Sequence, residues 1–479
     1  MSSSSEIRAR LDHPVLDADG HTVEFMPAVR EYLKDVAGGE VAARIFSSNA
    51  GNPIPFGWYK ASPDERLSDR RSRPPWWGLP SENTLDRATS MLPKLLYERL
   101  DETGVDFAII YPTTGLFALG TPVAEARLAL CRAINNYHAD VFAPYSDRLC
   151  PVAVIPMHTP EEAIAELDYA VGERGFKTIL MAGHVMRPIP TSSDSRRATW
   201  MDHLGIDSLY DYDPVWQRCL ELGVAPAFHS GGMGWGSRNS VNNYMFNHLG
   251  HFAAAGEATC KSLFMSGVTH RFPDLRFAFL EGGTGWAVNL YNDIIGHWEK
   301  RNRENVYRYD PRRMDLGQMS DLFERYGSEV LERLDSSALS SLLSPMGESF
   351  EVEEMVDEWQ AIGISQGEDI RERFVPSFFF GCEADDPMNA MAFDTRLNGF
   401  GARLQAIFSS DIGHWDVPDI SEVLEEAFEL REHGFLDDKD FRDFTFANTV
   451  KLYGALNPRF FEDTVVADAC ANEMRRQAA

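Results

Sequence analysis

The chain has 479 residues and a formal net charge of −28, because 73 Asp and Glu residues outweigh 45 Lys and Arg residues. Sequence-independent nucleic-acid binding needs a basic surface, and an anionic membrane leaflet repels an acidic chain, so we expect neither partner. No apolar run approaches the ~20 residues of a membrane-spanning helix, and the N-terminus lacks the apolar core of a signal peptide.

The six cysteines are scattered along the chain, with no CxxC pair among them. At this length, such spacing is typical of reduced cytosolic thiols rather than of a disulfide framework. The hydrophobic share of 44% and the charged share of 25% are those of an ordinary globular protein. We therefore expect a cytoplasmic, acidic protein with a sizeable core.

Short β-rich runs recur along the chain, and each is followed by a longer stretch with helical spacing. The eight runs are residues 14–19, 105–111, 149–155, 176–181, 224–229, 275–281, 374–380 and 404–410. Because they are apolar throughout, they favour a parallel sheet covered on both faces. Eight successive βα units predict an α/β fold, a (β/α)8 TIM-type barrel, with a doubly wound open sheet as the alternative.

Two of the intervening stretches carry specific helix signals. Residues 161–171 follow Thr159 and Pro160, which supply an N-cap and a proline in the first turn. Residues 421–431 carry apolar side chains three and four positions apart. Both stretches are predicted to be helices on the outside of the barrel.

We expect one barrel domain over residues 14–460, with terminal extensions at 1–13 and 461–479. Two stretches interrupt the βα period, at about 37–83 and 301–373. These stretches are interpreted as large insertions into the single domain.

The two insertions differ in composition. The first is rich in Gly, Pro, Arg and Trp, and its Trp76-Trp77 pair is typical of a cover over a barrel mouth or of a homodimer contact. The second contains an amphipathic helix near 319–334, a Ser-rich piece and the acidic segment 351–359. It is interpreted as a lid, as a dimerisation arm or as a peripheral addition (decoration) without a role in the site.

Polar side chains that suit a metal stand at the carboxyl ends of four of the eight runs. They are Asp19 and His21 at the end of the first, His229 at the end of the fifth, Glu281 at the end of the sixth, and Asp411 and His414 after the eighth. Asp19 and His21 are two residues apart and so project from the same side of a strand. In barrels of this type the chemistry gathers at these carboxyl ends.

Imidazoles and carboxylates on one rim form a mixed nitrogen and oxygen donor set, which suits a divalent Zn, Mn or Fe ion. Without a cation the carboxylates would repel one another and would be costly to bury. The sequence therefore predicts a site for one or two divalent ions per chain. His251, which shares a helix face with His248, is a weaker candidate ligand, and His414 is either a general acid or base or a structural residue.

Residues 231–240 form a glycine-rich segment without the GK[ST] ending of a phosphate-binding loop. We interpret it as a loop that passes close to a small-molecule substrate, with Arg238 available for an anionic group. No GxSxG elbow occurs, which disfavours serine-hydrolase chemistry.

The D-x-H after the first strand, the histidine after the fifth, RFPDLRFAFLEGG and SSDIGHWD together resemble amidohydrolase family 2. This branch contains aminocarboxymuconate-semialdehyde decarboxylase and the resorcylate decarboxylases. The resemblance covers roughly residues 14–298 and 374–458, with both insertions outside it. It implies that the metal ligands are Asp19, His21, His229 and Asp411, and it places His414 next to the substrate.

Two positions depart from the family's pattern. The usual H-x-H is D-x-H here, and the histidine usual before the sixth-strand Gly-Gly turn is Glu281. The resemblance implies a general base at that place, and a glutamate would act as that base or bridge two ions. Additional carboxylates favour iron or manganese over zinc, and a bridging carboxylate favours a dinuclear iron site.

The leading functional hypothesis is metal-dependent hydrolysis of an amide, ester or thioester by an activated water molecule. Glu281 would take the proton of the water, His414 would protonate the leaving group, and Arg238 would bind an anionic part of the substrate. The alternatives are non-oxidative decarboxylation of an aromatic or unsaturated acid, a dinuclear iron oxygenase, and a non-catalytic partner subunit.

Overall fold

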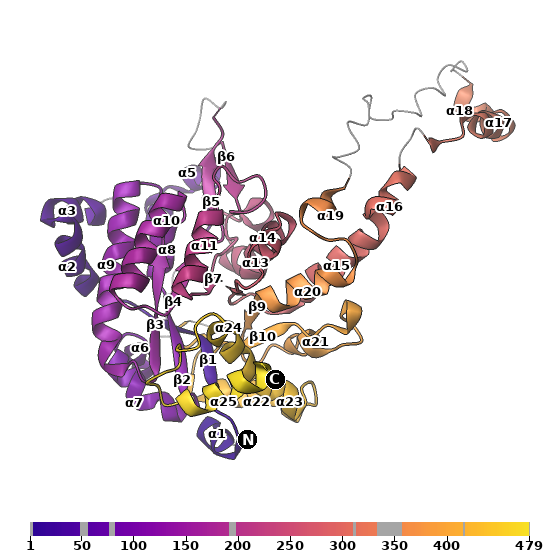
Figure 1. The fold of residues 1–479 in the computed structure, drawn as a ribbon. Coiled ribbons are helices and arrows are strands. Elements are labelled where there is room, and N and C mark those ends of the chain that lie inside the picture. Colours follow the sequence, from indigo (N-terminus) through magenta and orange to yellow (C-terminus); the bar gives the residue numbers. More distant parts are fainter. Residues whose placement is uncertain are drawn as a thin grey trace.

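The computed structural model describes residues 3–47, 56–75, 82–190, 198–309, 313–332, 357–414 and 417–478. Within them, eight strands form one sheet in the order β1-β2-β3-β4-β7-β8-β9-β10, and each neighbouring pair is parallel (Figure 1). The strands are β1 (Leu16–Thr22), β2 (Phe107–Pro112), β3 (Leu149–Ile155), β4 (Thr178–Met181), β7 (Pro226–Phe228), β8 (Phe277–Phe279), β9 (Phe378–Cys382) and β10 (Gln405–Phe408). The predicted (β/α)8 barrel is confirmed.

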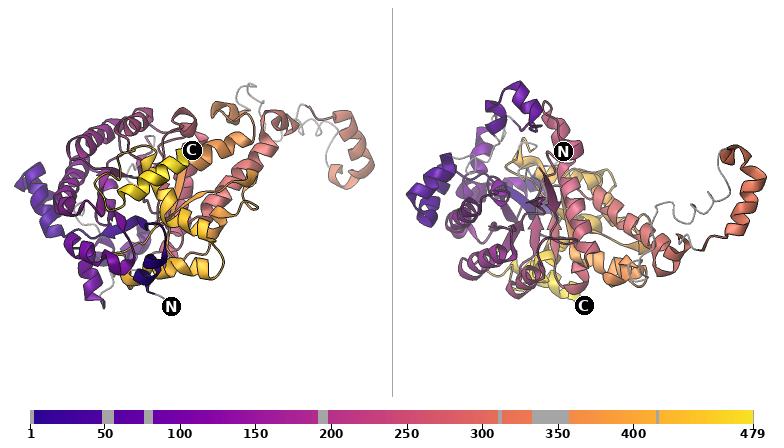
Figure 2. Two further views of the ribbon diagram at one scale, coloured as in Figure 1. Left: turned by 60° about the horizontal axis from the view of Figure 1, so that its bottom comes forward. Right: turned by 90° about the horizontal axis from the view of Figure 1, so that it is seen from above.

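Helices connect the strands and surround the sheet (Figures 1 and 2). Those of the barrel and its termini are α1 (Ser4–Arg10), α2 (Met26–Ala37), α6 (Thr84–Thr89), α7 (Pro93–Thr103), α8 (Gly115–Leu119), α9 (Ala124–Phe142), α10 (Pro160–Leu167), α11 (Asp213–Leu222), α12 (Tyr244–His248), α13 (His251–Met265), α14 (Val268–Arg271), α15 (Gly285–Arg301), α20 (Glu368–Ser377), α21 (Asn389–Phe393), α22 (Val423–Glu432), α23 (Asp438–Arg442), α24 (Asn448–Gly454) and α25 (Ala467–Ala478). The predicted helix at 161–171 is α10 together with a π-helical turn at Asp168–Glu173, and the one at 421–431 is α22 with a short turn before it.

Burial explains why these apolar runs become parallel strands. Every residue of β1, β2, β4 and β10 is buried. Phe277 of β8 packs against Trp216 of α11 with ring centroids 5.6 Å apart, and Phe378 of β9 packs against Phe374 of α20 at 5.0 Å. Helices thus cover the outer face of the sheet, as continuous apolar strands require.

The first and last strands close the barrel through irregular hydrogen bonds. The backbone N–H of Asp411 donates to the carbonyl of Asp19 at 3.0 Å, and that of His21 donates to the carbonyl of Ile412 at 2.9 Å. The pairing of β1 with β2 is irregular between Asp17 and Gly20. This seam therefore joins two of the strand ends that carry predicted site residues.

The sequence prediction started the seventh strand, 374–380, four residues before the observed start at Phe378. Helix α20 continues to Ser377 and β9 starts only at Phe378. Phe374 is fully buried as a helical residue, with its ring centroid 5.2 Å from that of Tyr291 in α15. A short aromatic run does not reveal by its period whether it is helix or strand.

An antiparallel hairpin that the sequence did not predict follows β4. It consists of β5 (Val185–Pro188) and β6 (Thr199–Asp202). Arg187 and Asp202 form a buried ion pair across it, with Nε and Oδ2 3.0 Å apart. Arg187 also donates to the carbonyl of His158 at 2.6 Å, which fastens the hairpin to the barrel.

The described part of the first insertion consists of α3 (Gly39–Ser47), α4 (Phe56–Lys60) and α5 (Pro63–Ser68); Trp76 and Trp77 lie outside the described residues. The indole N–H of Trp58 donates to the carbonyl of Val241 at 3.0 Å, and the backbone N–H of Arg73 to that of Ser240 at 2.9 Å. The insertion is thus tied to the glycine-rich loop after β7.

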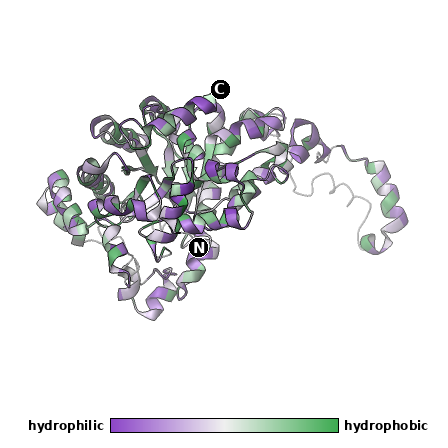
Figure 3. Cartoon of the chain, turned by 90° about the horizontal axis from the view of Figure 1, so that it is seen from below, coloured by the Kyte–Doolittle hydropathy of each residue, from purple (hydrophilic) through white to green (hydrophobic). Residues whose placement is uncertain are grey.

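The second insertion contains α16 (Arg303–Val306), α17 (Leu316–Tyr326), α18 (Ser328–Leu331) and α19 (Glu358–Ala361). Figures 1 and 2 show α17 and α18 projecting away from the barrel, and no residue of α17 is buried. Figure 3 shows hydrophilic and hydrophobic residues alternating along this projecting part, where the helix predicted near 319–334 is divided at Gly327 into α17 and α18. The Ser-rich piece and most of 351–359 lie outside the described residues.

Among the described residues, no helix combines the length and the hydropathy needed to cross a membrane.

Candidate functional site

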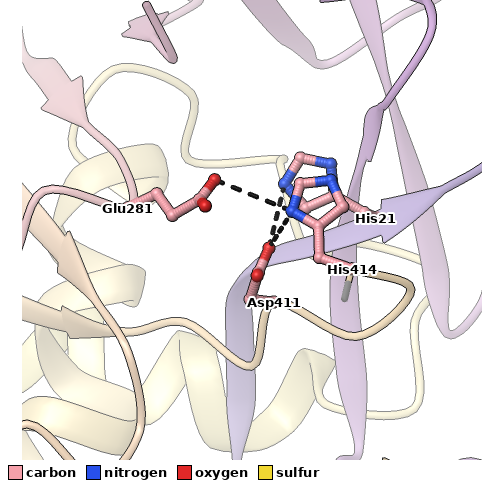
Figure 4. A group of neighbouring side chains, drawn as sticks. All are labelled: His21, Glu281, Asp411 and His414. Atoms are coloured by element: carbon pink, nitrogen blue, oxygen red, sulfur yellow. Dashed lines mark ion pairs between the residues drawn. The ribbon is translucent and has the colours of Figure 1, made fainter. Parts of the chain in front are cut away.

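Six predicted site residues come together at the carboxyl ends of the strands. Asp19 and His21 lie in β1, His229 follows β7, Glu281 follows β8, and Asp411 and His414 follow β10. Figure 4 shows four of these side chains, from β1 and from the segments after β8 and β10, pointing toward one another. Because the strands are parallel, their carboxyl ends lie at the same end of the barrel, and these donors share one rim.

His21 lies between two carboxylates. Its Nε2 is 3.4 Å from Oδ1 of Asp19 and 3.5 Å from Oδ1 of Asp411. Asp411 Oδ1 in turn lies 2.6 Å from Nδ1 of His414. Groups from both ends of the chain thus meet around one imidazole.

Glu281 approaches the same cluster from β8. Its Oε2 lies 2.8 Å from Nε2 of His229 and 3.7 Å from Nδ1 of His414. The donor atoms form two overlapping groups that share His21, and within each group all atoms lie within 4.8 Å of one another. One group is Asp19, His21 and His229; the other is His21, Glu281, Asp411 and His414.

The backbone is strained at two of these residues. Glu281 has a φ of 56° and Asp411 a φ of 50°, in the left-handed region that non-glycine residues seldom occupy. Such a conformation costs on the order of 1–3 kcal/mol and persists where the surroundings require it. Here it turns both carboxylates into the cluster directly after their strands.

Burial dominates the electrostatics of the cluster. The pKa of Asp19 is raised well above its usual value by burial, and Glu281 and Asp17 add to this against the opposing effect of His229. Burial likewise lowers the pKa of His21 well below 6.5, helped by the imidazoles of His414 and His229. Both effects disfavour the charged forms, so the imidazoles are kept neutral with a lone pair available.

His414 is held at both ring nitrogens. Its Nδ1 contacts Asp411, and its Nε2 lies 3.3 Å from Oγ1 of Thr113, which follows β2. Burial lowers the pKa of His414 to about 3, with smaller contributions from His229 and His248. Its side chain is 13% exposed, against 4% for Glu281 and 0% for His21, so it lies nearest to solvent of these three.

The donor set fits a divalent metal ion. Both carboxylate oxygens of Asp19 and both ring nitrogens of His21 are buried without a hydrogen bond to any described residue. Buried polar atoms in proteins are almost always satisfied. A cation bound among these imidazoles and carboxylates would satisfy them and would offset the carboxylate charge.

Two predicted residues lie outside these donor groups. Arg238 donates from Nη1 to the carbonyl of Leu249 at 2.5 Å and so binds a neighbouring loop. The ring of His251 packs against Phe252 with centroids 3.9 Å apart. His251 is not a member of either donor group formed by the described residues. The pKa of His251 is lowered to about 3, mainly by burial and to a smaller extent by the neighbouring His248.

Three residues of the site were missed from the sequence: Asp17, Ser410 and Thr113. Asp17 is fully buried and accepts hydrogen bonds from the backbone N–H of Ser410 at 3.0 Å and from its hydroxyl at 2.5 Å. The pKa of Asp17 is raised to about 6 by burial, which these bonds oppose. The only signal in the sequence was a second aspartate two positions before Asp19 in DADGH.

Residues that follow β4, β6 and β7 form an aromatic group. His184, His203 and Trp235 have ring centroids 5.2–5.8 Å apart. The hydroxyl of Ser230, the residue after His229, accepts from the backbone N–H of Gly183 at 2.7 Å. The aromatic group is therefore joined to the rim that carries the donor residues.

Comparisons with known proteins identify relatives of the chain. A family model described as "Amidohydrolase" matches residues 73–327, which is more than half of the chain. Decarboxylase orsB of Emericella nidulans is 31% identical over 174 residues. That match covers 33% of this chain and 45% of the relative, so it spans less than half of the relative's length.

Solved structures share the fold over almost the whole chain. A 2,6-dihydroxybenzoate decarboxylase complexed with 2,6-dihydroxybenzoate has a TM-score of 0.50 at 14% identity, covering 92% of this chain and 98% of its own. A dihydroxybenzoic acid decarboxylase from Polaromonas sp. JS666, with bound manganese and the inhibitor 2-nitroresorcinol, has a TM-score of 0.50 at 16% identity, covering 92% and 97%.

Proposed function

The chain belongs to the amidohydrolase family, and from that premise we propose that it is a metal-dependent decarboxylase of an aromatic or unsaturated carboxylic acid. The observation that carries the reaction class is the 31% identity to decarboxylase orsB. The fold shared with two dihydroxybenzoate decarboxylases, one of them with manganese, agrees with it. Hydrolysis, which the sequence favoured, becomes the second candidate.

The metal ligands in this proposal are Asp19, His21, His229 and Asp411. The buried atoms of Asp19 and His21 that make no hydrogen bond within the described residues support this assignment. When bound, a divalent cation supplies positive charge that attracts the substrate carboxylate and an adjacent oxygen. The net charge of −28 therefore does not prevent an anionic substrate from binding.

The chain's own residues then have to deliver a proton. In decarboxylation the bond between the substrate carbon and its carboxylate breaks, CO2 leaves, and the electron pair that remains takes up one proton. We assign Glu281 as the donor, because its carboxyl group is nearly buried and reaches the centre of the cluster. His414, 3.7 Å from Glu281 and more exposed, returns the proton from solvent.

Hydrolysis of an amide, ester or thioester is kept as a second candidate because of Glu281. A carboxylate 2.8 Å from His229 is also placed to act as a general base toward water. The overlap of the two donor groups at His21 would also accommodate a dinuclear iron site, as an oxygenase would require.

Isotope labelling of the manganese-loaded protein separates these reactions. With 2,6-dihydroxybenzoate and related aromatic acids as substrates, decarboxylation releases CO2 and, in heavy water, places one deuterium on the vacated carbon. In 18O-labelled water, hydrolysis of esters or amides of the same acids places the label in the product, whereas decarboxylation of the free acids leaves the organic product unlabelled. Release of 18O-labelled product without CO2 would overturn the proposal, and full activity without dioxygen would eliminate an oxygenase.

A further inference from the structure

Asp17 lies beneath the donor cluster and bonds to both sides of the barrel seam. Its Oδ1 accepts from the backbone N–H of Asp19 at 3.1 Å and from that of Ser410 at 3.0 Å. Its Oδ2 accepts from the hydroxyl of Ser410 at 2.5 Å, and the same hydroxyl accepts from the backbone N–H of Ile412 at 3.2 Å. One side chain thus contacts the backbone of the donor residue Asp19 and that of Ser410, which precedes the donor residue Asp411.

These bonds lie where the backbone ladder is interrupted. The register of β1 shifts between Asp17 and Gly20, so the backbone carbonyls there do not follow a regular pattern. The carboxylate of Asp17 accepts from the N–H of Ser410 in place of a backbone carbonyl, one residue before Asp411 donates to Asp19. The side chain therefore completes the row of hydrogen bonds that closes the barrel.

The space around Asp17 leaves little freedom for its carboxylate. A Cβ atom added at Gly20 would lie 2.7 Å from Oδ2 of Asp17 and 3.3 Å from the Cδ1 atom of Ile110. Glycine at position 20 thus leaves room for the carboxylate under the strand that carries Asp19 and His21.

We infer that Asp17 is a positioning residue that sets the separation between the Asp19–His21 pair and Asp411, and thereby the metal affinity of the site. The inference rests on the proposed metal site. Partners that orient metal ligands typically change affinity 10- to 100-fold when they are mutated. Asp17 itself stays out of the donor groups formed by the described residues.

The test uses the full-length, manganese-loaded protein, with Ser410→Ala and Asp17→Asn as the main variants. Manganese loss to a chelator is followed over time, and thermal unfolding is measured alongside. We expect each variant to lose manganese about tenfold faster than the unsubstituted protein. The double variant should lose it no faster than the single variants, because both changes break the same contact.

Two further variants complete the design. Gly20→Ala places a methyl group 2.7 Å from Oδ2 of Asp17 and so displaces the carboxylate, and we expect it to accelerate manganese loss as well. Asp106→Asn is the matched control, because Asp106 accepts from the backbone N–H of Val15 at 2.7 Å just before the start of β1. It should lower the unfolding temperature while leaving manganese retention unchanged.

The outcomes distinguish the inference from the proposed function. If the unsubstituted protein binds no manganese, iron or zinc, the metal site fails and the inference fails with it. If that protein binds manganese and folded Ser410→Ala and Asp17→Asn retain it equally long, only the inference is overturned.

Discussion

His21 and His414 stack with ring centroids 3.7 Å apart and planes 30° apart, although one belongs to the first strand and the other follows the last. Two imidazolium ions at this separation would repel each other strongly in a buried site. Burial already lowers the pKa of both rings. Both are therefore neutral near pH 7, which for His21 is the form that would bind a metal ion through a ring nitrogen.

His229→Ala should remove the metal and the activity together. The imidazole of His229 belongs to the donor group with Asp19 and His21, so the substitution removes one of the two nitrogen ligands of that group. Elemental analysis and CO2 release measure the two effects. His297→Ala is the control, since His297 lies on the surface of α15 with 53% of its side chain exposed. Retention of stoichiometric metal in His229→Ala would remove His229 from the ligand set.

Glu281→Gln should retain the metal but lower kcat by on the order of 10²–10⁴, because the amide keeps the shape of the side chain without carrying the proton. The pH profile of kcat should also lose one limb. Glu257→Gln on α13 breaks only a surface pair with Lys261 and should leave kcat unchanged. Near-normal turnover in Glu281→Gln would assign the proton transfer to another group.

Thr113→Val should lower kcat by about fivefold without loss of metal. The substitution removes the hydroxyl that lies 3.3 Å from Nε2 of His414. A single hydrogen bond contributes about 1 kcal/mol, which corresponds to that factor. Thr113→Ser keeps the hydroxyl and should restore activity; if it is as slow as Thr113→Val, packing of the methyl group rather than the hydrogen bond matters.

Acid should destabilise the protein partly through His184. A histidine in the unfolded chain titrates near pH 6.5. In the folded protein the pKa of His184 is lowered to about 4, mainly by burial and to a smaller extent by His203. Between these values the unfolded chain binds a proton that the folded chain does not, so the free energy of unfolding falls as the pH drops, by roughly 3 kcal/mol in total.

Denaturant unfolding between pH 7 and pH 4 measures this effect. His184→Gln has no proton to bind, so its free energy of unfolding should depend less steeply on pH over that range. His297→Gln, at the exposed position, should keep the full slope. Equal slopes for His184→Gln and the unsubstituted protein would show that His184 does not contribute.

The barrel and most of the site could be predicted from the sequence because strand order alone brings the strand ends together. Asp19 and His21 lie in the carboxyl half of β1, His229 and Asp411 follow their strands, and a parallel barrel places all carboxyl ends on one rim. The start of the seventh strand was wrong, because Phe374 is as well buried in α20 as it would be in a strand.

The supporting residues could not be predicted, because their contacts depend on tertiary structure. Asp17 and Ser410 meet only when the first and last strands close the barrel, and no local pattern connects them. The positive φ values of Glu281 and Asp411 are likewise set by the loops after their strands. The sequence led to hydrolysis as the first hypothesis, with Glu281 as its base, whereas the 31% identity to decarboxylase orsB is the reason that decarboxylation is proposed instead.

An anomalous difference map of crystals grown with manganese would locate the bound metal directly. We expect one strong peak among the side chains of Asp19, His21, His229 and Asp411, and a second peak beside Glu281 if the site is dinuclear. A map without a peak within bonding distance of Asp19 and His21 would contradict the proposed metal centre and the decarboxylation that depends on it.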